Sequence, residues 1–585
     1  MKLHLLVLFV ALSAFSVLSV RAEDSWVVQL KDGVNPARFA RQHGLTHVGP
    51  FAPLKDAGNY HVFSASHTKR ADYHRERIAR SLDAPDSGAM WSERQVPHVL
   101  HKRGRFLVSS PRTGPDGSGD PMWGQQWHLH GVDAASVDIT PHQERKGAGV
   151  LIGIVDDGLQ HSHPELSGRY DPTRSWDYND GDADPTPLYS DGHGTSAAAV
   201  ALGEANNGHC GQGVAPLARV AGIRVVAGPV TDATEASALS HHAGKIDIYS
   251  CSWGPADTGR DMVAPGHLVS QVFAHYAGQG AGRRGKGSIY VWASGNGRNR
   301  HDSCAYDGYA NSPYTIAVGA INHMGQRTWY SEGCAALMCV TPSSGAGEGI
   351  VTADLTGASG YEPGECTTGF GGTSSAAPLA SGIIALVLEE RPELTWRDVQ
   401  HVIAKGATLI HSEDSSWSPE NYNGYRHSNS YGFGLLKVPK MLATARAHTL
   451  VPVQKGHTSG IKHTPSVSAW AIPNNAGRSF RHTITLSSSG IQFIEHVLLS
   501  VYIAHPRRGE VSVYLKSPSG ITSTLALQRS DTHSNYPRSG WMYTTVHHWG
   551  ESDADGDWTA IFVDSVGNNQ FHGYVSWMKL SVFGY

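Results

Sequence analysis

A serine in a run of small residues is the first candidate for chemistry. Ser374 lies in Gly371-Gly372-Thr373-Ser374-Ser375-Ala376-Ala377-Pro378, directly before the apolar stretch Leu379 to Leu388. The glycines favour a sharp turn, and the apolar stretch predicts a buried helix whose first turn accommodates Pro378. Free N–H groups at the start of that helix would stabilise a developing oxyanion. Alone, the motif is equally typical of an ordinary turn, so a catalytic role requires partner residues.

Three separate residues earlier in the chain are candidate partners of Ser374. A serine hydroxyl needs an imidazole to take its proton and a carboxylate to orient that imidazole. Asp156 follows an apolar run, and His193 opens an alanine-rich stretch that predicts a helix. Asn296 stands in Ala293-Ser294-Gly295-Asn296-Gly297, where its amide could donate to an oxyanion. Singly these are a turn carboxylate, one of 34 histidines and a turn amide, but in the order Asp, His, Ser they predict acyl transfer.

An α/β domain would position these residues. From about Gly147 to Ala445 short apolar runs alternate with helix-like stretches, which predicts a mostly parallel sheet covered by helices. Active groups of such a sheet belong at the carboxyl ends of its strands, where Asp156 and Asn296 stand. The predicted strands are Val150 to Val155, Arg219 to Val226, Ile246 to Ser250, Ser288 to Ala293 and Tyr314 to Val318.

The segment before this domain is small and polar. Between Glu23 and Arg103 we predict a strand at Trp26 to Leu30 and a helix near Pro36 to Gln42. The segment ends in Lys102-Arg103. The following stretch, rich in Gly, Pro and Ser, is typical of an accessible linker.

The segment after the α/β domain has a different pattern. From about Thr449, alternation such as Val511-Ser512-Val513-Tyr514-Leu515 and turns such as Pro518-Ser519-Gly520 predict an all-β domain that reaches Tyr585. The fold class is therefore a mostly parallel α/β domain between a small α+β segment and a β domain.

Composition and the N-terminus indicate the compartment. The 585 residues include 47 basic and 51 acidic ones, and this balance argues against nucleic acid and membrane surfaces as partners. Lys2, the apolar stretch Leu5 to Val20 and the small residues before Ala22 are typical of a secretory signal peptide cleaved after Ala22. The alternative is an N-terminal membrane anchor, although the stretch is short for a span. In an oxidising lumen some of the six cysteines should pair, and spacing leaves all fifteen pairings open.

Longer strings give the sequence a family resemblance. The order Asp, His, Ser is that of subtilisin, and the central 330 residues or so resemble the kexin/furin branch of the subtilisin-like serine proteases, the proprotein convertases. The strings are Val155-Asp156-Asp157-Gly158, Tyr249-Ser250-Cys251-Ser252-Trp253-Gly254-Pro255, Val291-Trp292-Ala293-Ser294-Gly295-Asn296-Gly297, His301-Asp302-Ser303-Cys304 and Leu394-Thr395-Trp396-Arg397-Asp398. In the tail, Arg507-Arg508-Gly509-Glu510 resembles the family's P domain.

The resemblance implies domains and a maturation route. The expected domains are a signal peptide 1–22, an inhibitory prodomain 23–103, a subtilisin-like catalytic domain 104–446 and a β-sheet P domain 447–585. We expect autocleavage after Arg103, with Arg105 as the alternative, and a second cut near Arg70. His67, close to Arg70, is a candidate pH sensor, because protonation near pH 6 could loosen the prodomain.

The resemblance also implies cleavage after paired basic residues. Asp257 and Asp307 match positions that bind a P1 arginine, and Asp157 and Asp191 match or lie near positions that face P2. Recessed carboxylates select cations because a neutral side chain would leave them unpaired. Glu235 is retained in the outer subsites. Other acids of furin are replaced by Val263, Ala256 and Pro229, so we expect a weak preference for arginine at P4.

Calcium is the expected cofactor. Asp177, Asp182 and Asp184 crowd one loop and offer the hard oxygen ligands that calcium prefers, although an acidic loop is often merely solvated. The resemblance adds two further sites. One would use Asp120, Glu165 and Asn207 with the carbonyls of Glu204, His209 and Gly211, and the other Asp257, Asp302 and Glu332. By family position, Cys210 should pair with Cys366 and Cys304 with Cys334, which leaves Cys251 and Cys339 as thiols.

Together these features predict a calcium-dependent serine endopeptidase of the secretory pathway lumen, or a secreted one, that matures precursors at dibasic sites. Its partners would be precursor substrates and its own prodomain, and we expect a monomer without a membrane span in the mature chain. Two alternatives stay open: a secreted subtilisin of broad specificity, and a non-enzymatic binder or chaperone that retains its prodomain.

Overall fold

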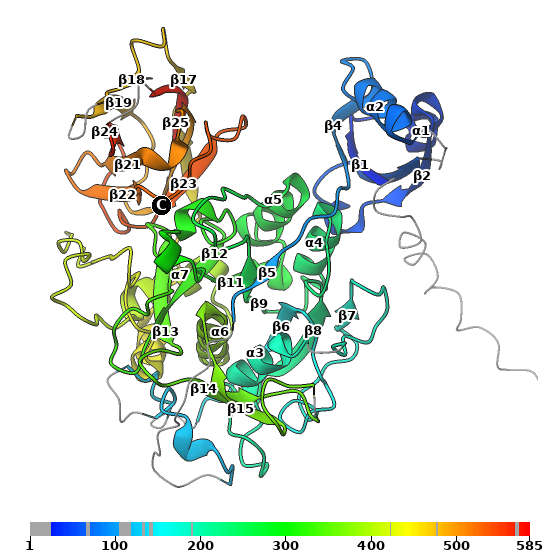
Figure 1. Cartoon of the computed structure of the whole chain (residues 1–585), viewed down its shortest axis with the longest axis vertical. Helices are drawn as coiled ribbons and strands as arrows, with labels where there is room; N and C mark the ends of the chain where they lie inside the picture. Colours follow the sequence, from blue (N-terminus) through cyan, green and yellow to red (C-terminus); the bar gives the residue numbers. More distant parts are fainter. Residues whose placement is uncertain are drawn as a thin grey trace, which may run out of the picture.

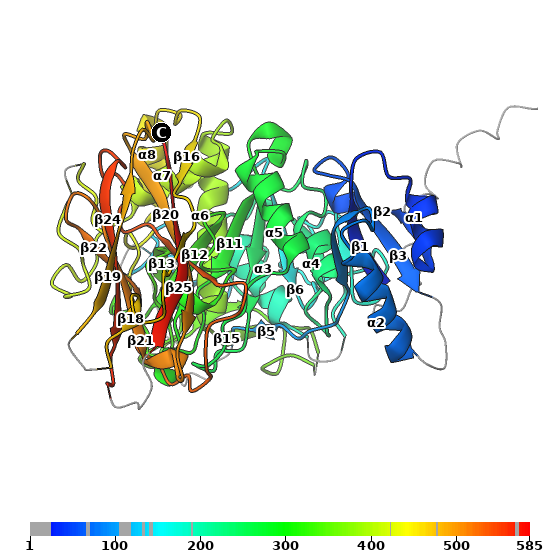
Figure 2. The same cartoon turned by 90° about the horizontal axis from the view of Figure 1, so that it is seen from above.

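A computed structural model describes residues 25–65, 71–104, 119–130, 135–139, 144–188, 191–357, 359–421, 423–474, 478–567 and 573–585. The described chain has three parts (Figures 1 and 2). A small sheet with two helices, in blue, and a β domain, in orange and red, lie at opposite ends of a central α/β domain. The signal peptide, Arg70, His67 and Arg105 lie outside the described residues, so their predictions are untested. Among the described residues, none of the helices is both long and apolar enough to cross a bilayer.

The N-terminal part is a sheet between its own helices and the central domain. Strands β1 (Ser25–Leu30), β2 (Leu45–Pro50), β3 (Tyr60–Ala65) and β4 (Ala89–Arg94) are antiparallel in the order β2-β3-β1-β4. Strand alternation sends Trp26 and Val28 to one face, where they form a core with Phe39 of α1 (Pro36–His43) and Ile78 of α2 (Ala71–Leu82). Val27, on the other face, joins the core of the central domain.

The end of this part enters the central domain as a strand. After β4 the chain reaches β5 (His101–Lys102), which pairs antiparallel with β10 (Trp253–Gly254). In Figure 1 the ribbon runs through β5 into the middle of the central domain.

The central domain is built on a seven-stranded parallel sheet in the order β13-β12-β11-β9-β6-β8-β7. The prediction of a mostly parallel sheet is confirmed. The predicted strands correspond to β6 (Leu151–Asp156), β8 (Arg219–Arg224), β9 (Ile248–Cys251), β11 (Ile289–Ala293) and β12 (Thr315–Ile321). The other elements are β7 (Trp176–Asp177), β13 (Leu337–Pro342), the hairpin β14 (Ile350–Ala353) and β15 (Cys366–Phe370), and helices α3 (His193–Leu202), α4 (Asp232–Leu239), α5 (His267–Phe273), α7 (Trp396–Gly406) and α8 (Val438–Ala447).

Helix α6 (Thr373–Glu390) begins next to Ser374, as predicted, but Pro378 is placed differently. It begins at Thr373, so Pro378 lies inside the helix and not in its first turn as expected. A proline cannot donate to the carbonyl four residues before it. That carbonyl belongs to Ser374, and it accepts the Ser252 hydroxyl at 3.1 Å. The proline therefore releases a backbone acceptor that anchors the serine to a neighbouring loop.

The C-terminal part is a two-sheet β domain. One sheet has the order β16-β25-β20-β23, with β17 and β18 also pairing β25, and the other has the order β19-β24-β21-β22. Trp541 donates to the Ala305 carbonyl at 2.9 Å, and Arg397 donates to Glu495 at 3.0 Å, so charged and aromatic side chains join the β domain to the central domain. The strands are β16 (Lys455–Thr458), β17 (Lys462–His463), β18 (Ala471–Ile472), β19 (Phe480–Leu486), β20 (Ile494–Ala504), β21 (Val511–Lys516), β22 (Thr522–Ala526), β23 (Trp541–Thr545), β24 (Gly556–Asp564) and β25 (Gly573–Gly584).

Candidate active site

Asp156 and His193 meet at the carboxyl end of the parallel sheet. Asp156 ends β6, and His193 is the first residue of α3. His193 Nδ1 lies 2.8 Å from Asp156 Oδ1, and both side chains are at most 2% exposed. Burial alone would lower the pKa of His193, but the Asp156 carboxylate outweighs this effect and raises it. Asp156 thus holds the imidazole and stabilises its charged form.

Ser374 lies at the start of α6 with its backbone N–H exposed to the site. Gly372, at φ 71°, provides the turn that leads into the helix. The Ser374 hydroxyl donates to the Ser252 carbonyl at 3.1 Å, so it must rotate before it can donate to His193. Among the described residues, His193 Nε2 has no hydrogen-bond partner and is available for that proton.

Asn296 and Ser374 hold one carbonyl oxygen between them. Asn296 Nδ2 donates to the Arg103 carbonyl at 2.6 Å, and the Ser374 N–H donates to the same oxygen at 3.2 Å. The Asn296 oxygen accepts the Thr373 N–H at 2.9 Å, which orients the amide. Two donors on one carbonyl are the arrangement of an oxyanion hole. The carbonyl of the Arg103–Gly104 peptide therefore occupies the position of a substrate carbonyl.

Gly104 lies against the catalytic side chains. A Cβ atom built on Gly104 would be 2.6 Å from His193 Nε2 and 3.4 Å from Ser374 Cβ. The imidazole nitrogen is thus beside the residue that would leave as an amine.

The Arg103 side chain fills a buried pocket. It is 1% exposed, donates to Asp307 Oδ2 and to the Ala293 carbonyl at 2.5 Å each, and lies 3.6 Å from Asp257 Oδ1. Burial opposes the charge, but Asp307 and Asp257 more than offset it and raise the pKa of Arg103. Both predicted P1 carboxylates surround one guanidinium.

Lys102 faces the second pair of carboxylates. Its ammonium group lies 2.8 Å from Asp157 and 3.2 Å from Asp191. Strand pairing of β5 with β10 directs the Lys102 and Arg103 side chains to these two separate acidic pockets. Burial again opposes the charge, and Asp157 outweighs it, so the pKa of Lys102 is raised.

Glu235 contacts His98 rather than the P4 position. Its buried carboxylate lies 3.4 Å from the Nε2 atom of His98, which stands two residues before the P4 residue Leu100. Leu100, at P4, is 6% exposed and joins the hydrophobic core. The contact that Glu235 makes therefore belongs to a more remote subsite.

The contact between the prodomain and the outer subsites should tighten at acid pH. Glu235 raises the pKa of His98, and burial and then Asp232 raise the pKa of Glu93 to about 7. Because the pKa of His98 is raised in the complex, protonated His98 contributes its full stabilisation of association below about pH 6.5. This contribution is lost as pH rises through the raised pKa. Because the pKa of Glu93 is raised in the complex, association becomes less favourable as the pH rises above the ordinary pKa of a glutamate.

We therefore expect the processed protein to release its prodomain more slowly at pH 5.5 than at pH 7.5. Size-exclusion chromatography would measure this release. His98→Gln should flatten this dependence, whereas His101→Gln, on the exposed neighbouring strand, should retain it. Equal pH profiles for His98→Gln and the unmodified protein would contradict the assignment.

The predicted calcium site at Asp120, Glu165 and Asn207 fits a cation. Glu165 is 1% exposed, and its Oε1 atom has no hydrogen-bond partner among the described residues. Burial and then Asp120 raise the pKa of Glu165 to about 9. Asp120 accepts the Asn207 N–H at 2.8 Å and so orders the loop that carries the remaining predicted ligands, Glu204, His209 and Gly211. A buried glutamate beside a second carboxylate is suited to a divalent ion.

The acidic set beneath Arg103, which consists of Asp257, Asp302 and Glu332, is also suited to bind a cation. Burial and then Asp302 and Asp257 raise the pKa of Glu332 well above its usual range, and burial raises the pKa of Asp302 to about 6. Arg529 of the β domain lies 3.5 Å from Asp302. The carboxylate oxygens of the three acids do not all lie within 4.8 Å of one another, so an ion would have to draw them together.

The acidic loop is arranged differently from the prediction. Asp177 Oδ2 accepts Arg224 Nη1 at 2.6 Å, and Asp184 Oδ1 accepts the Thr186 N–H at 3.1 Å. Within the described residues, the carboxylates of Asp177, Asp182 and Asp184 do not gather as a set within 4.8 Å. A guanidinium already neutralises the most buried of them, so this loop gives the weakest fit to calcium.

Two disulfides brace the site. Cys210 is bonded to Cys366 and Cys304 to Cys334. Cys251 and Cys339 are buried thiols, and burial raises the pKa of each, so neither is activated as a nucleophile.

Sequence reasoning missed the backbone contributions. The Ser252 carbonyl accepts both the Arg103 N–H at 3.0 Å and the Ser374 hydroxyl, and the Ala293 carbonyl accepts the Arg103 side chain. Both residues stand in the strings that carry the resemblance, but a carbonyl group has no residue-type signature.

Comparisons with known proteins give this geometry a context. Residues 147–434 match the model of the subtilase family, and residues 494–582 match the proprotein convertase P-domain. Furin from Bos taurus is 36% identical over 575 residues, which cover 96% of this chain and 68% of furin. Proprotein convertase subtilisin/kexin type 5 from Rattus norvegicus is 36% identical over 92% of this chain, which spans only 30% of that relative.

A solved structure supports the fold. The serine protease of Aeromonas sobria superposes with a TM-score of 0.72 at 22% identity, over 82% of this chain and 97% of that protein.

Proposed function

Since the chain belongs to the kexin-like proprotein convertases of the subtilase family, we propose that it is a calcium-dependent serine endopeptidase that matures precursor proteins after paired basic residues. One observation carries the proposal. The chain's own Lys102-Arg103-Gly104 segment lies in the site as a substrate would, with both basic side chains on carboxylates and the Arg103 carbonyl between Asn296 and Ser374.

The reaction would proceed through an acyl-enzyme. Ser374 Oγ attacks the carbonyl carbon while His193 Nε2 takes the hydroxyl proton, and Asp156 stabilises the imidazolium. Asn296 Nδ2 and the Ser374 N–H stabilise the negative oxygen, to which one such donor contributes about 3 kcal/mol. His193 Nε2, next to Gly104, then protonates the leaving amine. Water releases the acyl group by the reverse proton transfers.

Calcium would be held by Asp120, Glu165 and Asn207 at one site and by Asp257, Asp302 and Glu332 at the other. When bound, the ion supplies the positive charge that lets these crowded carboxylates stay ionised. Asp257 also lies beside the P1 guanidinium, so the second site would link P1 binding to calcium binding at the acidic set beneath Arg103.

Maturation and compartment follow from the same proposal. Cleavage after Arg103 would turn residues 23–103 into a bound inhibitor. The signal peptide at 1–22 and the two disulfides are consistent with the secretory pathway lumen or secretion. Arg70 would be the second cut that releases the inhibitor.

At P4 we expect little discrimination between leucine and arginine. Leu100 is accommodated in an apolar environment, and Glu235 is directed to His98. Substrates with Leu-x-Lys-Arg and Arg-x-Lys-Arg should therefore have kcat/KM values within about fivefold, since a solvent-exposed ion pair contributes at most about 1 kcal/mol. A hundredfold preference for arginine would show that an acidic P4 pocket exists.

The function as a whole is tested with a fluorogenic Leu-x-Lys-Arg peptide and the secreted protein, in calcium and in chelator. We expect turnover in calcium, loss of turnover in chelator, and at least a hundredfold lower kcat/KM on a matched Leu-x-Gln-Gln peptide. Equal turnover of the neutral peptide would indicate a subtilisin of broad specificity. A processed protein without turnover on either peptide would indicate a binding protein.

A further inference from the structure

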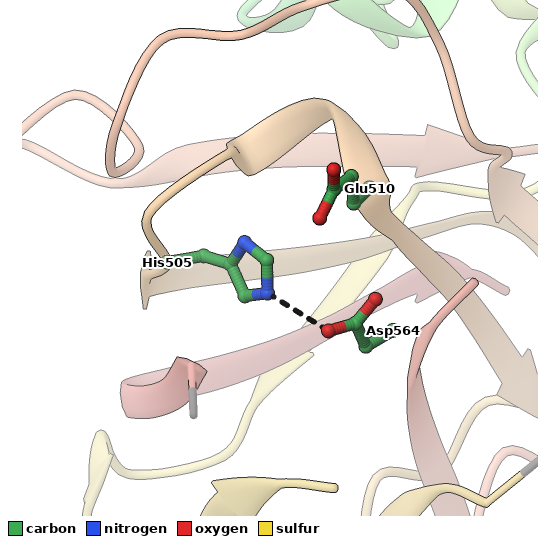
Figure 3. Close-up of side chains that lie close together, drawn as sticks. All are labelled: His505, Glu510 and Asp564. Atoms are coloured by element: carbon green, nitrogen blue, oxygen red, sulfur yellow. Dashed lines mark hydrogen bonds and ion pairs between the residues drawn. The ribbon is translucent and has the colours of Figure 1, made fainter. Parts of the chain in front are cut away.

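A second chemically distinctive cluster lies in the β domain. Within the described part of the chain, His505, Glu510 and Asp564 form the one group of three metal-ligating side chains whose ligand atoms all lie within 4.8 Å of one another. All three residues are buried. Figure 3 shows them converging from three places: His505 just after β20, Glu510 in the short turn before β21, and Asp564 at the end of β24.

The imidazole is oriented as a metal-binding histidine would be. His505 Nδ1 lies 2.7 Å from the Arg507 carbonyl oxygen and 3.1 Å from the Arg507 backbone nitrogen, so the Arg507 backbone holds this ring nitrogen. Nε2 is therefore the ring nitrogen that faces the Asp564 carboxylate and that could bind an ion. The ring is also held in place, because a Cβ atom on Gly573 would be only 2.2 Å from His505 Cδ2.

The distance across the cluster suits an ion better than a direct hydrogen bond. His505 Nε2 is 3.4 Å from Asp564 Oδ2, whereas a charged histidine donating to a carboxylate is typically about 2.7–2.9 Å away. Ligands that lie about 2.0–2.1 Å from a tetrahedral zinc ion are about 3.3 Å from each other. The separation therefore matches the edge of a tetrahedral coordination shell.

The charges around the cluster also call for a cation. Asp564 Oδ1 accepts the N–H groups of Val566 and Gly567, so Oδ2 is the oxygen that faces the histidine. Glu510 Oε1 lies 3.4 Å from the Arg507 guanidinium, whose side chain is 56% exposed. Glu510 and Asp564 thus place two buried carboxylates beside one imidazole, and a divalent ion bound there would compensate charge that is costly to bury.

We propose that His505, Glu510 and Asp564 bind a divalent transition-metal ion, with zinc as the expected occupant. Nitrogen with carboxylate oxygens is a ligand set that zinc accepts, whereas calcium prefers oxygen alone. A water molecule would complete a tetrahedral shell. This site is separate from the calcium ligands, and it requires no proteolytic activity.

Such an ion would fix a loop that touches the catalytic domain. Arg508, between two of the ligands, donates to Asp531 and to the Arg260 carbonyl at 2.8 Å. Asp531 in turn accepts Arg529, the residue that lies 3.5 Å from Asp302. Metal binding at residues 505–510 is therefore connected, through three ion pairs, to the acidic set beneath the P1 pocket.

The test is zinc binding by the full processed protein, kept in calcium so that calcium ligands are occupied. Competition with a chromophoric zinc chelator should reveal one equivalent bound with Kd below about 1 µM, and zinc should raise Tm. His505→Gln and Asp564→Asn should each weaken binding at least tenfold and remove the Tm shift. His463→Gln, which removes an exposed histidine on β17 of the same domain, should bind as the unmodified protein does.

A second measurement keeps the proposal testable should the variants fail to fold. Cobalt(II) added to the unmodified protein should give the visible absorption of a tetrahedral nitrogen–oxygen site, and zinc should displace it. Equal zinc affinity of the unmodified protein and His505→Gln, or the lack of both zinc binding and a cobalt spectrum, would overturn the proposal. The cluster would then be an imidazolium–carboxylate ion pair.

Discussion

Ser374→Ala should yield a chain that folds but keeps its prodomain covalently attached. The hydroxyl is the only atom of the site that is removed, while the Ser374 N–H still donates to the Arg103 carbonyl and Asn296 still donates to it. Removal of the nucleophile from a triad of this kind lowers kcat by about a million-fold. Intact mass measurement of the secreted protein should therefore find the Arg103–Gly104 bond uncut.

Ser375→Ala is the matched control. The neighbouring hydroxyl contacts Ser343 Oγ at 2.7 Å and is directed away from the Arg103 carbonyl. This variant should process itself and retain peptide turnover within a few-fold. Normal cleavage after Arg103 in Ser374→Ala would mean that another protease processes the chain, and it would remove the main support for self-processing.

Asp307→Asn should cause the largest loss among the substrate-binding carboxylates. Asp307 contacts the fully buried Arg103 guanidinium, and removing one partner of a buried ion pair costs about 3 kcal/mol or more. With P1-arginine peptides, kcat/KM should fall by about a hundredfold or more. The amide keeps the volume of the carboxylate, so the Tm should change little relative to the effect on kcat/KM.

Asp191→Asn provides the comparison for that measurement. Asp191 is 23% exposed and lies 3.2 Å from Lys102, which keeps its closer contact to Asp157. Partial exposure screens the interaction, so kcat/KM should fall by less than about threefold. Equal losses for the two variants would mean that P1 selectivity does not depend on the buried pair.

The catalytic set could be predicted because its members follow elements with strong patterns. Asp156 ends the buried strand β6, Asn296 closely follows the buried strand β11, and Ser374 opens a long apolar helix, so each position is determined by a strand or helix end. The same logic located five strands of the parallel sheet. Pro378 was assigned to the first turn because the pattern shows where apolar residues begin, whereas α6 already includes Thr373-Ser374-Ser375-Ala376-Ala377, which has no apolar periodicity.

Contacts between distant segments could not be predicted in the same way. Arg224 neutralises Asp177 from a neighbouring strand, and the sequence of the acidic loop contains no sign of that partner. Likewise, 59 residues separate His505 from Asp564, and they meet only because β20 and β24 end near each other. Local sequence patterns specify strands and helices, whereas these pairings depend on how the sheets pack.

The substrate-like position of Arg103 has a consequence for the order of events in time. While the bond to Gly104 is intact, the cleavage segment and Ser374 belong to one molecule, so the first cut is unimolecular and its rate is independent of protein concentration. After the cut, the prodomain is a separate molecule, and its return to the site becomes bimolecular. Dilution should then favour its departure, so a crowded vesicle would retain inhibited enzyme and discharge into a larger volume would itself promote activation.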